Sequence, residues 1–122
     1  MISCDTNILF PAFDTTSPLH TSSRAFLDSH KTNDDFCLCE QVLMELYCLL
    51  RNPAVCRNPL SAPDTVAIIE GLRSNPHWGI VDVLSEPAVM QWVWQRAAQA
   101  GFAYRRIFDL RLAATLQLHR VS

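Results

Sequence analysis

The hydrophobic positions of this chain follow two periods. Three short, largely apolar segments are bounded by polar or turn-forming residues, which is the pattern of a strand. Elsewhere apolar residues recur at intervals of three and four, which is the pattern of a helix with one buried face. The predicted strands are residues 1–4, 34–41 and 78–84, and the predicted helices lie within residues 8–13, 15–31, 41–53, 57–76, 85–101 and 107–120.

Capping and turn-forming residues predict where these helices begin and end. Pro11 interrupts the short helix over residues 8–13, and Ser17 caps the next helix with Pro18 at its first position. Pro53 ends the helix that begins at residue 41. Ser61 and Pro63 mark the start of the helix within residues 57–76, and Asn75-Pro76 marks its end. Ser85 caps the helix within residues 85–101, and Gly101 ends it.

The order of these elements predicts an α/β fold. Strands alternate with helical segments, which favours a layered domain with a mainly parallel sheet. The chain of 122 residues is long enough for a single domain over residues 1–122. Ligand sites of such sheets lie beyond the carboxyl ends of the strands, and Asp5 follows the first predicted strand at that edge.

Composition narrows the class of protein. With 49% hydrophobic and 18% charged residues the chain is typical of a globular domain, and its net charge of −2 argues against a non-specific basic nucleic-acid binder. It does not exclude an enzyme that acts on nucleic acid through a bound metal. We expect no membrane span and no signal peptide. The five cysteines are an odd number and suit free thiols in a reducing cytoplasm.

Three acidic residues lie where an α/β frame could bring them together. Asp5 follows a strand, Glu45 lies beside the buried stripe of the helix over residues 41–53, and Asp109 begins the last helix. Each also has an ordinary interpretation as a strand end, a half-buried helix carboxylate or a helix-start residue. Converging carboxylates need a cation, and Mg²⁺ or Mn²⁺ prefers oxygen ligands. Such an ion can activate water against a phosphodiester.

Several other side chains allow both a functional and a structural interpretation. Thr6 and Asn7 follow Asp5 and either position water or a phosphate oxygen or cap the next helix. We expect the three tryptophans, Trp78, Trp92 and Trp94, to pack in the fold rather than to stack on RNA bases. We expect the three arginines near Asp109, which are Arg105, Arg106 and Arg111, to offset the local negative charge rather than to contact phosphates.

Three segments together resemble the PIN-domain ribonucleases, and among them the VapC-type toxins of toxin–antitoxin modules. They are CDTNILFPAF at 4–13, EQVLMELYCLLRNP at 40–53 and RRIFDLRLAATLQLHRV at 105–121, in the family's order and spacing. The resemblance implies a three-layer α/β/α domain and a metal-dependent endoribonuclease. Asp5, Glu45 and Asp109 would be its catalytic and metal-binding residues, with Thr6 and Asn7 positioning substrate or water, whereas Glu40 is assigned to a solvated helix start.

The resemblance also implies partners and one departure. It implies an RNA substrate, a cognate antitoxin, a homodimer and a cytoplasmic location. PIN domains usually continue into a further strand and a threonine–asparagine–aspartate segment, whereas this sequence stops at Ser122. The domain is therefore expected to be C-terminally short. The alternative to a nuclease is an inactive, truncated remnant that binds an antitoxin or a second copy of itself.

Overall fold

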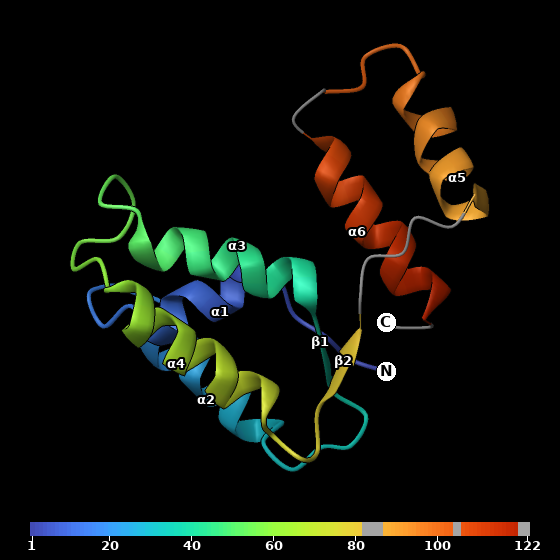
Figure 1. The fold of residues 1–122 in the computed structure, drawn as a ribbon. Coiled ribbons are helices and arrows are strands. Elements are labelled where there is room, and N and C mark those ends of the chain that lie inside the picture. Colours follow the sequence, from blue (N-terminus) through green and yellow to red (C-terminus); the bar gives the residue numbers. More distant parts are fainter. Residues whose placement is uncertain (82–86, 104–105, 120–122) are drawn as a thin grey trace.

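The computed structural model describes residues 1–81, 87–103 and 106–119 (Figure 1). Helices dominate these residues, and the strands are short. The elements are α1 (Thr6–Phe13), α2 (His20–Ser29), β1 (Cys37–Cys39), α3 (Glu40–Arg51), α4 (Ala62–Arg73), β2 (Gly79–Val81), α5 (Pro87–Ala97) and α6 (Ile107–Leu118).

The strands are parallel, as the sequence predicts. β1 pairs with β2 in a register that places Leu38 beside Ile80. Ile2 pairs in parallel with Phe36 by a single bridge, so the predicted first strand contributes a bridge and not a ladder. β1 therefore lies between the amino-terminal segment and β2. This confirms the α/β prediction, with a smaller sheet than expected. Residues 82–84 of the third predicted strand lie outside the described residues.

The main core forms where α1 and α3 meet β1. Every residue of β1 is buried, because both faces of the strand are covered. Cys37 and Cys39 act there as small apolar side chains, as predicted. α3 contributes its predicted stripe, of which Leu46 and Leu50 are fully buried. The buried side chains of this core are Leu9, Ala12, Leu27, Phe36, Leu38, Cys39, Val42, Leu43, Leu46, Leu50, Leu72 and Leu112.

Two predicted features of the first helices are wrong. α1 is not interrupted at Pro11 but continues to Phe13. Pro11 removes only one backbone N–H donor near the end of the helix, and its own burial helps to hold the last turn. α2 begins at His20, after the predicted start. The Oγ of Ser17 accepts the backbone N–H of Leu19 at 3.1 Å, so Ser17 and Pro18 form a turn that precedes the helix.

The predicted limits of α4 agree with the structure, whereas the predicted end of α5 is wrong. Ser61 caps α4 as expected, its Oγ accepting the backbone N–H of Asp64 at 3.3 Å. α5 ends at Ala97, before the predicted stop at Gly101. The N–H of Gln99 turns back to the carbonyl of Arg96, and Gly101 takes a positive φ of 84° in the loop that follows. Ser85 lies outside the described residues.

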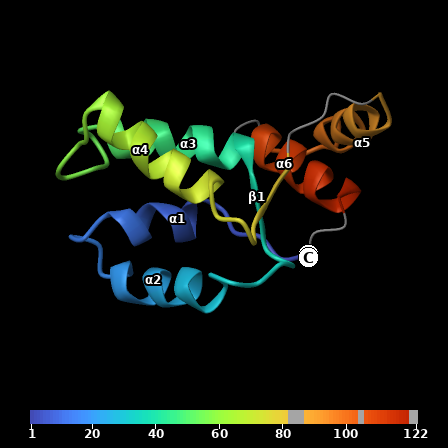
Figure 2. The ribbon, with the colours of Figure 1, turned by 60° about the horizontal axis from the view of Figure 1, so that its bottom comes forward.

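The last two helices form a pair beside the strands (Figure 2). Val89 and Val93 of α5 bury against Ala114 of α6, which makes a small second core. Leu112, on another face of α6, is buried in the main core. α6 thus has apolar contacts on two sides. This double anchoring places the amino-terminal end of α6, with Asp109, beside α1 and α3.

Candidate metal centre and adjoining pocket

Asp5 lies at the junction between the amino-terminal bridge and α1. It is the N-cap of α1, and its Oδ1 accepts the backbone N–H of Thr6 at 2.6 Å. The Thr6 hydroxyl donates to the same oxygen at 3.3 Å. The carboxylate that ends the strand is therefore also held in one orientation. In the described residues these bonds use Oδ1 alone, which leaves Oδ2 for another ligand.

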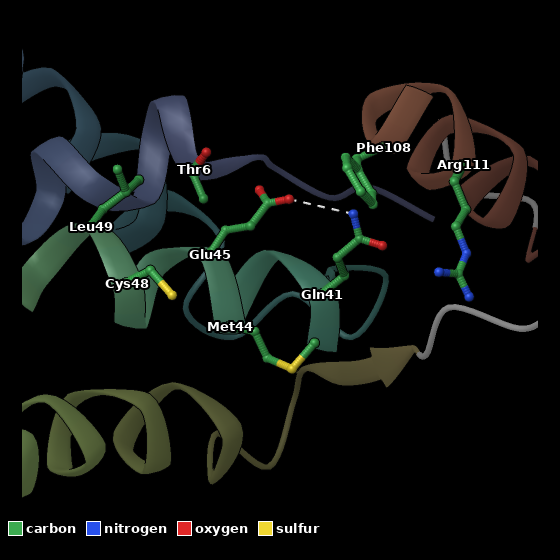
Figure 3. A pocket seen from close by; sticks show the side chains of 8 residues that line it. All are labelled: Thr6, Gln41, Met44, Glu45, Cys48, Leu49, Phe108 and Arg111. Carbon is green, nitrogen blue, oxygen red and sulfur yellow. Dashed lines mark hydrogen bonds between the residues drawn. The ribbon is translucent and has the colours of Figure 1, made fainter. Parts of the chain in front are cut away.

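Glu45 projects from α3 at the edge of the main core and is half-buried. Its Oε1 accepts a hydrogen bond from Nε2 of Gln41 at 3.4 Å (Figure 3). Burial raises the pKa of Glu45, and the negative charges of Asp5 and Asp109 raise it further, against the opposing effect of the Gln41 bond. Glu45 thus lies within electrostatic reach of Asp5 and Asp109, although the three residues come from distant parts of the sequence.

Asp109 lies in the first turn of α6 and is exposed. It lines a cavity of about 270 Å³ together with Asp5. Leu112 and Leu116 of the same helix also line this cavity. Folding therefore brings Asp5 and Asp109 to one hollow, whereas Glu45 faces a neighbouring pocket that it shares with Thr6.

The oxygen atoms of Asp5, Glu45 and Asp109 suit a hard divalent cation, but the three carboxylates lie too far apart to bind one ion together. Within residues 1–81, 87–103 and 106–119, no three His, Cys, Asp or Glu side chains lie close enough together to hold a metal ion. The chemistry nevertheless fits, because three carboxylates and a hydroxyl offer only oxygen ligands. The ion pairs between residues that the structure describes involve other carboxylates, namely Asp34, Asp35, Glu40 and Glu70. The repulsion felt by Glu45 is one that a cation would relieve.

Of the other residues discussed with the candidate site, Thr6 lies at it, whereas Asn7 and Glu40 do not line either hollow. Thr6 lies beside Glu45 in the neighbouring pocket, whereas Asn7 is exposed on α1 and lines neither of the two hollows. Glu40 accepts a hydrogen bond from Nε of Arg73 at 2.8 Å, which agrees with a helix-start residue in a surface ion pair.

The neighbouring pocket has a volume of about 630 Å³ and opens between α3 and α6. Figure 3 shows Phe108 projecting from α6 toward Gln41 of α3, with Arg111 on the same helix. Sequence reasoning missed Phe108. The signal available in the sequence was a large aromatic residue directly before the candidate ligand Asp109. The pocket is lined by Thr6, Gln41, Met44, Glu45, Cys48, Leu49, Phe108 and Arg111.

Comparison with known proteins places the chain in a family. No family model matches it. It is 44% identical over 122 residues to Ribonuclease VapC24 of Mycobacterium tuberculosis, from strains CDC 1551 / Oshkosh and ATCC 25618 / H37Rv, covering 100% of this chain and 82% of the relative. The chain belongs to the VapC-type PIN-domain family. The predicted resemblance is therefore confirmed.

A solved structure supports the fold of this VapC-type chain. The crystal structure of Mycobacterium tuberculosis VapC20, a sarcin-ricin loop cleaving toxin, matches it with a TM-score of 0.71 at 13% identity, over 99% of this chain and 85% of the other. At that identity the likeness speaks for the fold. In the part of the chain that the structure describes, no helix is both long and apolar enough to cross a membrane.

Proposed function

We propose that this VapC-type chain is a metal-dependent endoribonuclease and the toxin of a toxin–antitoxin pair. The observation that carries the proposal is the 44% identity to a ribonuclease along the whole chain. The grouping of Asp5, Glu45 and Asp109 at one end of the fold supports it, because each has an electrostatic or cavity link to the others. RNA phosphodiester hydrolysis is the chemistry that such a group can perform with a divalent cation.

Asp5, Glu45 and Asp109 would hold the ion, which is Mg²⁺ or Mn²⁺ in this proposal. The bound cation would supply activation of water and stabilisation of the charge that develops on the phosphate. The cap bonds from Thr6 hold the Asp5 carboxylate in orientation before any ligand arrives. Thr6 also lines the pocket of Glu45, and in this proposal its hydroxyl positions a water or a phosphate oxygen. Asn7 is a weaker candidate because it lines neither hollow.

The proposal includes partners of the kind that VapC-type toxins use. RNA is the substrate, a cognate antitoxin covers the site, and two copies of the chain form a homodimer. We place the protein in the cytoplasm, where its RNA substrate lies and where its cysteines would stay reduced as thiols. Copurification with a co-expressed antitoxin, sedimentation of the purified chain and cell fractionation test these statements separately.

An inactive remnant is the weaker alternative, since the alignment to a ribonuclease, at 44% identity, covers the whole of this chain. A cleavage assay separates the two. The purified chain is incubated with labelled single-stranded RNA in Mg²⁺, in Mn²⁺ and in EDTA, beside its Asp5→Asn variant. We expect cleavage by the unaltered chain with either ion and none in EDTA. Equal cleavage by Asp5→Asn, or none by either protein, would end the nuclease proposal.

A further inference from the structure

The pocket between α3 and α6 has the properties of a site for a flat organic group. Its volume of about 630 Å³ falls in the range of small-molecule pockets. Met44, Leu49 and Phe108 supply apolar walls. The polar atoms come from only a few side chains, among them Gln41, whose amide is both a donor and an acceptor. A nucleobase has this same combination of an apolar face and a polar edge.

Phe108 is the unusual residue of this pocket. It is 64% exposed, although its neighbours on α6 are used in packing: Leu112 in the main core and Ala114 against α5. An exposed ring that is held on a helix and turned toward a pocket offers a stacking surface that costs little conformational entropy. Arg111, which follows one turn later, adds a positive charge to the same pocket.

The pocket adjoins the candidate metal centre. Glu45 and Thr6 line it, and Asp109 directly follows Phe108 in the sequence. An RNA phosphate held at the carboxylates would therefore place a neighbouring nucleotide at the pocket. We infer that this pocket receives an RNA nucleobase beside the cleaved phosphodiester, that Phe108 stacks on the base, and that Arg111 contacts the adjoining phosphate. The inference rests on the proposed ribonuclease function and adds a substrate-binding residue to it.

The test compares binding of two probes, so that loss of stacking is separated from general damage. One probe is a fluorescein-labelled single-stranded RNA of mixed sequence, and the other is an abasic ribose-phosphate strand of the same length. Binding is measured by fluorescence anisotropy in Ca²⁺, a hard cation that carboxylates accept, with the strands checked on a gel for integrity. The proteins are the unaltered chain, Phe108→Leu, Phe108→Trp and the control Trp94→Leu, which alters a 59% exposed aromatic on α5 outside this pocket.

We expect the unaltered chain to bind the RNA more tightly than the abasic strand. Phe108→Leu should reduce this preference about tenfold, a typical value for one base–aromatic stack, without changing affinity for the abasic strand. Phe108→Trp should keep the preference, and Trp94→Leu should not alter it.

Three results would overturn the inference. Phe108→Leu could leave the preference unchanged, could weaken both probes equally as general damage would, or could change only self-association measured by sedimentation. If the unaltered chain still cleaves RNA in Mg²⁺ in these cases, only the base pocket is wrong. If the unaltered chain neither binds nor cleaves RNA, the proposed function fails and the base pocket fails with it.

Discussion

Asp5 and Asp109 line one cavity of about 270 Å³, although they lie near opposite ends of the sequence. Asp5 is held by its cap of α1, and Asp109 by the burial of Leu112 one turn further along α6. The two carboxylates are thus positioned by independent structural features. The negative charges of both aspartates raise the pKa of Glu45. This arrangement makes separate predictions for each residue.

Asp5→Asn should separate the structural role of this side chain from its chemical role. Asparagine is as good an N-cap as aspartate, so α1 and the thermal unfolding midpoint should be little changed. RNA cleavage in Mg²⁺ should fall by about 100-fold or more, because a neutral amide binds a hard cation poorly. Parallel melting and cleavage curves check this prediction. A variant that melts normally and cleaves normally would contradict it.

Asp109→Asn has a matched control in Asp64→Asn. Each aspartate is the third residue of its helix, α6 or α4, so each substitution removes a similar favourable interaction with the helix dipole, about 0.3–1 kcal/mol. Only Asp109 lines the cavity that contains Asp5. We expect Mg²⁺-dependent cleavage to be lost in Asp109→Asn and kept in Asp64→Asn, as measured on the same RNA. Similar activity of the two variants would place Asp109 outside the site.

Glu45→Gln should stabilise the metal-free chain at neutral pH. The pKa of Glu45 is raised by burial and by Asp5 and Asp109, so its ionised form opposes folding. This penalty is absent below the ordinary glutamate pKa, where both states are protonated, and is complete above the raised folded-state pKa. Urea unfolding in EDTA should show the variant more stable at pH 7, with the difference vanishing as the pH falls.

Mn²⁺ should stabilise the unaltered chain more than it stabilises Glu45→Gln. The ion binds the folded state, and the variant lacks one of the proposed carboxylate ligands. Unfolding midpoints measured across a Mn²⁺ titration check this. Equal stabilisation of both proteins would remove Glu45 from the ligand set while leaving its raised pKa in place.

Leu112→Ala should be costly, since this leucine anchors α6 to the main core and is 6% exposed. We expect a loss of about 2–5 kcal/mol in the free energy of unfolding. Leu118→Ala, at an exposed position of the same helix, should cost about 0.5 kcal/mol or less. Urea denaturation of both variants measures the difference. Equal losses would show that α6 is not anchored through Leu112.

Thiol labelling should distinguish Cys48 from the other cysteines. Cys48 is exposed and lines the pocket assigned to RNA, whereas Cys37, Cys39 and Cys56 are buried. Burial, with the charge of Asp5, raises the pKa of Cys4 to about 12, so its thiolate is scarce at pH 8. Mass spectrometry after brief treatment with iodoacetamide should find Cys48 modified first, and single-stranded RNA should slow that reaction. Equal labelling of Cys4 and Cys48 would contradict the described burial.

Local elements followed from the sequence wherever the local pattern was strong. The stripe of α3 and the Ser61 cap of α4 depend on residues a few positions apart, so their structures could be predicted. The limits at Pro11 and Gly101 were wrong because burial and turn hydrogen bonds decided them. The exposure of Phe108 could not be predicted either, since it depends on which faces of α6 pack against α5 and the main core.

The sequence by itself determined the α/β order, the parallel pairing and the family, because these follow from local periodicity and from motif residues in a fixed order. It also supplied Asp5, Glu45 and Asp109 as candidates. Only the tertiary structure decided their relation: Asp5 and Asp109 share a cavity, Glu45 faces the adjoining pocket, and their spacing in the described residues is too wide for an ion. The physical reason is that side-chain separation across a fold is set by how α6 packs, and the residues that fix this packing are far from the acids they position.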